Sequence, residues 1–273
     1  MVLENKNAIV YGAGGSLGGA VATALAQAGA RVFLTGRKLP PLQKTAAAIL
    51  AAGGKADVEE VDALDEKAIN GHLERVIQKA GTLDISFNAV GVDLVQNIPL
   101  TDISVADFIQ PITYTMQTRF LTAIAAAKVM MKQGSGVILT LTATPGGIGY
   151  PYTGGFAPAC CAVESLSRNL ASELGAYGVR VVNIRSAGSP DSRVFKEAIA
   201  GNPAAMKPVI QGMENDTMLK KLPLMADIAN VAVFLASDLS GKITGVTVDV
   251  TSGTTAGLNY RAPAHHQLTP RTV

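Results

Sequence analysis

Residues 12–19, with the sequence GAGGSLGG, join a short apolar run to a pattern that is typical of a helix. The apolar run, residues 8–11, has the composition of a buried strand, and apolar residues recur at helical spacing over residues 17–28. Glycines let the backbone approach a pyrophosphate closely, and a helix N-terminus offers free N–H groups and partial positive charge. Strand, loop and helix in this order predict a dinucleotide-binding site. The alternative is a purely structural turn, because Leu17 stands where the G-x-G-x-x-G spacing has its third glycine.

Strand and helix patterns alternate along the rest of the chain. Such alternation is typical of a parallel sheet that is covered by helices on both faces. We therefore expect an α/β protein, a single-domain, doubly wound Rossmann fold with a parallel sheet of about seven strands, over residues 1–258. The further strand patterns are residues 31–35, 56–62, 83–88, 136–141, 179–184 and 245–250, and the further helix patterns are residues 42–52, 66–80, 107–132, 163–174 and 227–236.

Two segments lie outside this alternation. Residues 189–225 contain several Pro, Gly and Asn and four of the eight methionines, a composition that favours a substrate loop or lid. An ordinary surface excursion is the alternative for this segment. Residues 259–273 have the composition of a polar C-terminal tail.

Charge and cysteine content indicate which binding partners and which cellular location to expect. Lys and Arg number 23 against 21 Asp and Glu, and the sequence has no basic stripe, which argues against a nucleic-acid partner. Charged residues make up only 16% of the chain, so part of the surface is expected in contacts between the subunits of a homotetramer or homodimer. The two cysteines are adjacent, no signal peptide is visible, and the longest uncharged stretch is broken by Gly and Pro. These features predict a soluble cytoplasmic protein without a membrane partner.

The loop after the second strand pattern carries cations instead of an acid. Residues 35–38 are Thr-Gly-Arg-Lys, at the place where dinucleotide sites use an acid for the ribose diol or an Arg for a 2′-phosphate. A guanidinium fork matches a phosphate well, so Arg37 predicts NADP(H) over NAD(H). A solvated loop charge is the alternative for Arg37. No metal is expected, because His72, His265 and His266 show no ligand spacing with Cys or acids.

Several segments match one family in combination. Residues 11–18, YGAGGSLG, are similar to its T-G-x-x-x-G-x-G loop, with Tyr11 and Ser16 as departures, and residues 87–91, FNAVG, are similar to its N-N-A-G motif. Residues 162–181 and 227–245 match its late helix, strand and C-terminal block. Over residues 3–258 the chain resembles a short-chain dehydrogenase/reductase. The resemblance implies cofactor contacts from Gly12, Gly15, Ser16, Leu17, Gly18, Arg37, Asp62, Ala63, Asn88, Ala89, Gly91 and Gly188.

The resemblance also implies a catalytic set that this sequence lacks. In the family a Tyr donates the proton to the carbonyl, and a Lys four residues later lowers the pKa of that Tyr and holds the nicotinamide ribose. A Ser orients the carbonyl, and an Asn anchors a water relay. Counting along the motifs places the Tyr, Lys, Ser and Asn positions at Phe156, Cys160, Ala143 and Thr115. The sequence therefore predicts an atypical member without the usual Asn, Ser, Tyr and Lys.

Other residues near these positions are candidate substitutes. Tyr152, and next to it Tyr150, could donate a hydrogen bond to substrate, although a phenol without a nearby Lys keeps a pKa near 10; pocket lining is the alternative. Arg119 and Arg185 could polarise a carbonyl or bind a carboxylate, or form surface ion pairs. Cys160 could be a nucleophile only as a stabilised thiolate, and is otherwise a small buried residue.

The expected function is that of an NADP-binding oxidoreductase with a non-standard active site. Its substrate would be a small organic carbonyl, enone or imine-type molecule. One alternative is a non-redox enzyme, a cyclase, lyase or isomerase, on the same scaffold. The other is a catalytically inactive NADP-binding protein.

Overall fold

The computed structural model describes residues 1–257, whose strands form one seven-stranded sheet. The strand order is β3-β2-β1-β4-β5-β6-β7, and all neighbouring strands are parallel. The order reverses between β1 and β4, which is the switch point where doubly wound sheets bind their ligands. The predicted α/β Rossmann fold is confirmed. The strands are β1 (Asn7–Tyr11), β2 (Arg31–Gly36), β3 (Lys55–Glu60), β4 (Ile85–Asn88), β5 (Gly136–Ala143), β6 (Val179–Ser186) and β7 (Thr247–Val250).

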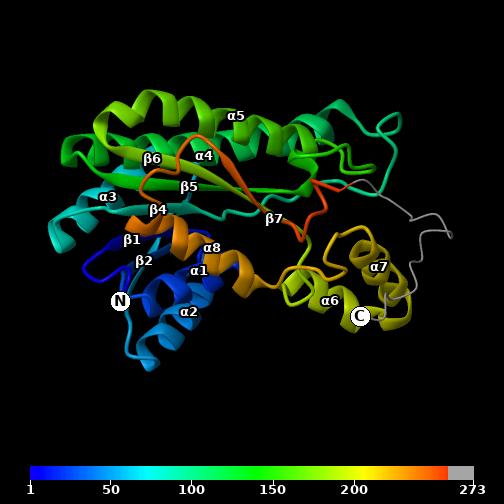
Figure 1. The fold of residues 1–273 in the computed structure, drawn as a ribbon, viewed down its shortest axis with the longest axis horizontal. Coiled ribbons are helices and arrows are strands. Elements are labelled where there is room, and N and C mark those ends of the chain that lie inside the picture. Colours follow the sequence, from blue (N-terminus) through cyan, green and yellow to red (C-terminus); the bar gives the residue numbers. More distant parts are fainter. Residues whose placement is uncertain (258–273) are drawn as a thin grey trace, which may run out of the picture.

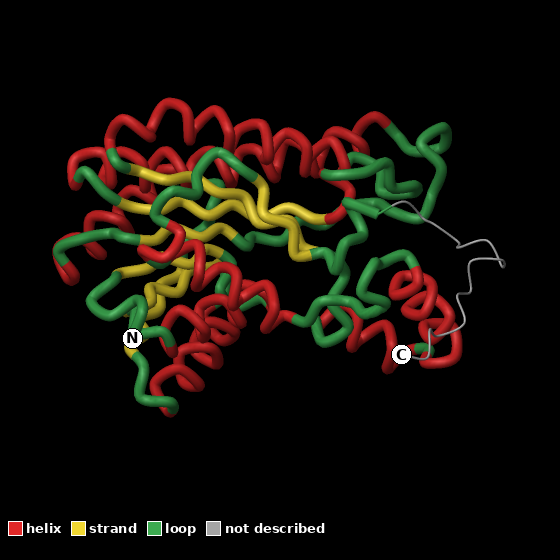
Figure 2. Tube along the Cα trace, viewed as in Figure 1, coloured by secondary structure: helices red, strands yellow, loops and turns green. Residues whose placement is uncertain are grey.

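Helices cover both faces of the sheet (Figures 1 and 2). One layer contains α1 (Ser16–Gln27), α2 (Leu39–Ala51) and α8 (Met225–Ala236), and the opposite layer contains α3 (Glu66–Ala80), α4 (Val105–Gln133) and α5 (Phe156–Leu174). Short 3-10 turns lie at Thr144–Gly146, Gly175–Tyr177 and Asp238–Ser240. No helix within residues 1–257 is long and apolar enough to cross a membrane.

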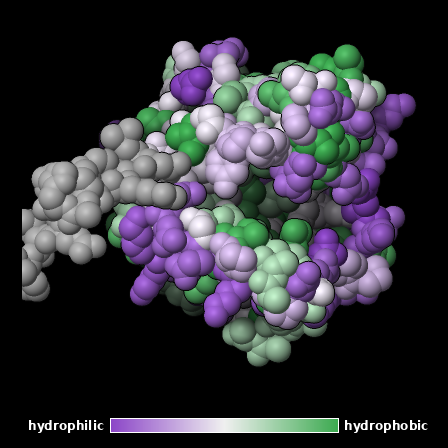
Figure 3. All heavy atoms as spheres, turned by 90° about the vertical axis from the view of Figure 1, so that its right-hand side faces the viewer, coloured by the Kyte–Doolittle hydropathy of each residue, from purple (hydrophilic) through white to green (hydrophobic). Residues whose placement is uncertain are grey.

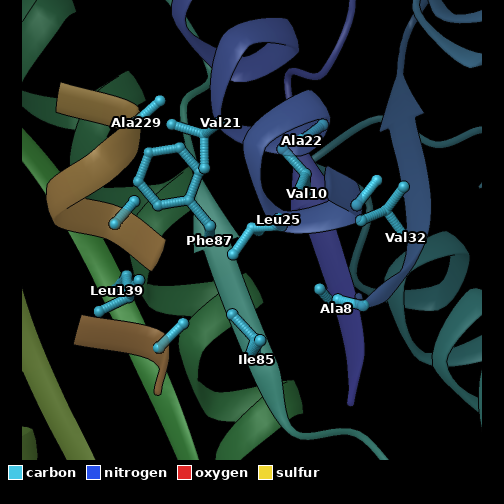
Figure 4. Packing of buried hydrophobic residues seen from close by; sticks show 14 of the residues in the cluster. Ala8, Val10, Val21, Ala22, Leu25, Val32, Ile85, Phe87, Leu139 and Ala229 are labelled. Carbon is cyan, nitrogen blue, oxygen red and sulfur yellow. The ribbon is translucent and has the colours of Figure 1, made fainter. Parts of the chain in front are cut away.

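The core is divided between the two faces of the sheet. Successive residues of β1 alternate, so that Val10 packs into the layer of α1 and α8, and Ile9 into the layer of α3 and α4. In Figure 4, Phe87 of β4 lies beside Val21 of α1 and Ala229 of α8. Fully buried strands of this kind hold the carboxyl ends of β1, β4 and β5 at one edge.

Helix α5 begins seven residues before the predicted start at residue 163. The sequence FAPACCA lacks a strong apolar period, but Pro158 lies in the first turn, where proline is tolerated. The early start places Phe156 and Cys160 on one face of the helix, one turn apart. Helix α4 agrees with its predicted range, and its N-cap Ser104 accepts a hydrogen bond from the Asp107 N–H at 3.1 Å.

The segment 189–225 is largely helical. It contains α6 (Arg193–Gly201) and α7 (Pro203–Asn215), which stand beside the C-terminal edge of the sheet in Figure 1. Figure 3 views the molecule from this end and shows a hollow between an upper and a lower rim. The predicted tail at 259–273, with His265 and His266, lies outside the described residues.

Candidate active site

The glycine-rich loop turns sharply between β1 and α1. Gly12 has φ +76°, and a Cβ there would lie 2.8 Å from the Ala89 carbonyl carbon, so only glycine fits. A Cβ on Gly18 would collide with the Gly12 carbonyl. The N-cap of α1 is Gly15, which has no side chain to cap the first N–H groups. The loop therefore offers bare backbone donors to an anion. The Ser16 Oγ accepts the Arg193 N–H at 2.9 Å and connects the loop to α6.

A cavity of about 510 Å³ opens over this loop. Arg37 is exposed at its wall, after β2, and makes none of the ion pairs found among residues 1–257. Asn88 is not part of the lining; its side chain donates to the Thr118 carbonyl at 3.1 Å and accepts the Val90 N–H at 3.0 Å, which fixes the loop after β4. Of the predicted cofactor residues, those at the cavity wall are Gly12, Gly15, Ser16, Leu17, Gly18, Arg37, Asp62, Ala63, Ala89 and Gly91.

A second cavity, of about 290 Å³, lies where β5, β6 and α5 meet the α6–α7 segment. Gly188, predicted as a cofactor residue, lies in this second cavity, and a Cβ there would be 2.6 Å from the Met213 Cε. The lining consists of Gln96, Ala143, Thr144, Pro145, Tyr150, Thr153, Phe156, Ala187, Gly188, Phe195, Met213, Asp216, Leu222 and Thr254.

The two candidate tyrosines differ in position. Tyr150 lines the second cavity and is 39% exposed. Tyr152 is 55% exposed, is absent from that lining, and has φ +61°, with its carbonyl accepting the Asn97 N–H at 2.8 Å. The geometry thus favours Tyr150 over Tyr152 as a group that could reach a substrate. Sequence spacing could not separate them, because the turn between them decides where each ring points.

Of the four positions implied by the family motifs, two line the second cavity and two are buried outside its lining. Ala143 ends β5 and Phe156 begins α5, and both line the cavity. Cys160 is 3% exposed, and burial raises the pKa of its thiol to about 11. The thiol is therefore neutral near pH 7, as expected for a small buried residue. Thr115, on α4, is also buried.

The threonines beside Ala143 have different surroundings. Thr142 donates its hydroxyl proton to Glu164 at 2.9 Å, inside the protein. Thr144 lines the second cavity and donates to the Ser186 carbonyl at 3.3 Å. Of these two threonines, Thr144 is the one whose side chain belongs to the cavity lining.

Arg185 belongs to a buried ion-pair network. Its guanidinium forms two hydrogen bonds with Glu164, at 2.9 and 2.6 Å, and one with Asp249 at 2.6 Å. The Arg185 side chain is only 12% exposed, so the predicted ion pair exists but is not at the surface. Two carboxylates neutralise this arginine, which leaves it unsuited to hold a substrate anion.

Arg119 and His72 are buried in different settings. Arg119 is 6% exposed, makes no ion pair within the described residues, and donates from Nη1 to the Val90 carbonyl at 2.8 Å. His72 pairs with Glu59 at 2.9 Å, and burial lowers the pKa of its imidazole.

No group of three or more His, Cys, Asp or Glu within residues 1–257 could hold a metal ion.

Comparison with known proteins decides the family. Residues 12–255 match the family model described as enoyl-(acyl carrier protein) reductase. The chain belongs to the short-chain dehydrogenase/reductase family. Among curated proteins, levodione reductase of Leifsonia aquatica is 28% identical over 91% of this chain and 93% of its own length. The 7alpha-hydroxysteroid dehydrogenase of Escherichia coli K12 is 28% identical over 94% and 97%.

Solved structures agree with this assignment. The crystal structure of levodione reductase superimposes with a TM-score of 0.86 at 25% identity, covering 94% of this chain and all of the other. NAD+-bound xylitol dehydrogenase has a TM-score of 0.85 at 25% identity, with coverage of 93% and 100%. This short-chain dehydrogenase/reductase is thus an oxidoreductase of a family whose members bind NAD or NADP.

Proposed function

We propose that this chain is an NADP(H)-dependent oxidoreductase with a non-standard active site. The observation that supports the proposal is a cavity over the glycine-rich loop, with Arg37 at its wall, together with a second cavity lined by Ala143 and Phe156, the residues found where counting along the family motifs expects Ser and Tyr. Cys160, at the Lys position, contributes a neutral thiol. Catalysis then depends on substrate positioning and hydrogen bonding, and not on a Tyr whose pKa is lowered by a neighbouring Lys.

The residues of the first cavity fit a phosphorylated dinucleotide. Gly12 and Gly18 leave the room that a pyrophosphate needs at the N-terminus of α1. Arg37, with no carboxylate partner among the described residues, supports recognition of a 2′-phosphate, and hence NADP(H). When bound, the nicotinamide supplies or accepts the hydride.

The second cavity supports a substrate that needs no strong acid. Phe156 has no proton to give, and the Thr144 hydroxyl proton is already donated to the Ser186 carbonyl, which leaves Tyr150 to donate a hydrogen bond from the cavity wall. An iminium carbon gains the hydride while its C=N π electrons become the nitrogen lone pair, so no proton is required. Asp216 is the only formally charged residue in the described lining, and the rings of Tyr150, Phe156 and Phe195 suit a neutral or cationic organic molecule.

We further propose a single-domain, oligomeric organisation for the protein. Residues 1–258 act as one domain in which 189–225 close the substrate cavity, since Phe195 and Met213 of that segment already line it. Phe120 and Ile109, exposed apolar residues of α4, support a homotetramer or homodimer. A cytoplasmic location is part of the same proposal, as are small-molecule substrates without nucleic-acid or membrane partners.

The test is a substrate panel with NADPH, containing simple ketones, cyclic enones and cyclic iminium ions, with cofactor oxidation followed by absorbance. We expect turnover of the activated acceptors and little or none of the ketones. Tyr150→Phe should slow this turnover more than Tyr152→Phe does. Product formation without cofactor oxidation would favour the non-redox alternative, and NADPH binding without any turnover would favour an inactive binding protein.

A further inference from the structure

Arg119 is a buried cation whose charge is not compensated by a carboxylate within the described residues. Its Nη1 donates to the Val90 carbonyl at 2.8 Å and to the Thr118 hydroxyl at 3.1 Å, but its Nε has no partner. Arg180 provides a contrast, because it donates to three carbonyls at and beyond the end of α8, where the helix dipole is negative. An uncompensated buried guanidinium is costly, so its position calls for a functional reason.

A second orphaned polar atom lies one helical turn before Arg119. Only four buried side-chain nitrogen or oxygen atoms in residues 1–257 lack a hydrogen-bond partner, and two of them are Thr115 Oγ1 and Arg119 Nε. Residues four apart share one face of α4. Orphaned buried polar atoms are rare in native proteins and indicate a partner that the protein atoms do not supply.

This pair lies behind the wall of the dinucleotide cavity. Val90, whose carbonyl Arg119 holds, lines that cavity together with Gly91 and Tyr114. The Arg119 guanidinium lies near the Tyr114 phenol and the Cys160 thiol, and burial lowers its pKa to about 10, so it is still charged near pH 7.

Strand order determines which half of a dinucleotide reaches this wall. The glycine-rich loop, Arg37 and Asp62 follow β1, β2 and β3, so together they take one nucleotide. The other half must cross the switch point and lie over β4 and β5. Its ribose therefore comes to the loop at Val90 and Gly91.

We infer that Arg119 and Thr115 form the binding site for the hydroxyl groups of this second ribose, with the positive charge supplied from α4. The inference rests on the proposed cofactor function. Cys160, whose position would carry a lysine in the family, is too short and uncharged for the task. Arg185 is neutralised by Glu164 and Asp249. Arg119 thus takes the place of the missing lysine from a different helix.

The experiment compares two ligands on the same variants. NADPH reaches both halves of the cavity, while 2′,5′-ADP reaches only the adenosine half. Arg119→Met should weaken NADPH binding about tenfold or more, the scale of a charged hydrogen bond, and leave 2′,5′-ADP binding unchanged. Unchanged 2′,5′-ADP binding also shows that the variant is folded. Arg168→Met, at an exposed arginine of α5, is the matched control and should change neither affinity.

Two further variants test the position of the charge. Arg119→Lys should keep part of the NADPH affinity, and Arg119→Met combined with Cys160→Lys should restore it by moving the cation to α5. Equal losses for both ligands in Arg119→Met, no loss for either, or no recovery in the double variant would each overturn the inference. Wild-type protein that binds neither ligand would instead refute the proposed cofactor function, and this inference with it.

Discussion

Phe156, Cys160 and Glu164 lie on successive turns of α5 and have different surroundings. Phe156 lines the second cavity and has no proton to donate, Cys160 is a buried neutral thiol, and Glu164 is paired with Arg185. In the proposed function, single side chains at these positions determine whether the site can transfer protons.

Arg37→Asp should weaken NADPH binding by about 1–3 kcal/mol, because a charged hydrogen bond is lost and a like charge now faces the 2′-phosphate. NADH binding should weaken much less. Fluorescence titration with both cofactors measures this, with Arg168→Met as the control. Equal NADPH and NADH affinities in the wild type would remove Arg37 from the site.

Phe156→Tyr combined with Cys160→Lys should raise the reduction of simple ketones by about tenfold or more above the sum of the single variants. A Tyr alone keeps an ordinary phenol pKa, whereas Tyr and Lys act as a unit, and a positioned acid contributes roughly 10²–10⁴-fold. NADPH oxidation by wild type, both singles and the double measures the effect. If the wild type already reduces ketones robustly and Tyr152→Phe abolishes this, Tyr152 is the acid and the non-standard site is refuted.

At the scale of elements, α5 is attached to the sheet by more than apolar contacts. Arg185 of β6 binds Glu164 of α5 and Asp249 of β7, and Thr142 of β5 donates to the same Glu164. This network joins three strand ends to the helix that carries Phe156 and Cys160. The network thereby fixes the position of the α5 wall of the second cavity.

Glu164→Gln should lower the free energy of unfolding by about 3 kcal/mol, because it leaves a mostly buried guanidinium with only one carboxylate. Urea unfolding followed by circular dichroism measures the change. Glu173→Gln, at an exposed position of the same helix, should cost less than about 0.5 kcal/mol. Similar small losses in both variants would show that the network contributes little.

On the whole-molecule scale, helix α4 presents apolar side chains to solvent in the single chain. Phe120 is 48% exposed and Ile109 is 46% exposed, both on α4. Exposed apolar side chains on one helix are candidates for contacts between subunits, and symmetric assembly is the common outcome for oligomers.

Light scattering at micromolar concentration should therefore give a mass of two or four chains. Phe120→Glu should shift the population toward smaller species, because the new carboxylate would be buried without a partner in the interface. Lys128→Glu, at another exposed position of α4, provides the charge control. A wild-type monomer at all concentrations would refute the assembly.

The sequence by itself determined the alternation of strands and helices, the glycine-rich loop at the start of α1, and the order that makes a doubly wound sheet. These features depend on local periodicity and on backbone freedom at a few glycines, which act within ten to twenty residues of chain. Tertiary structure alone decided that α5 begins at Phe156, that the 189–225 segment forms two helices, and that Tyr150 lines the cavity. It also decided the partners of the buried arginines: Arg185 meets residues 21 and 64 positions away, and Arg119 reaches back 29 positions to Val90. Such contacts depend on which elements the whole sheet brings together, and no local pattern encodes them.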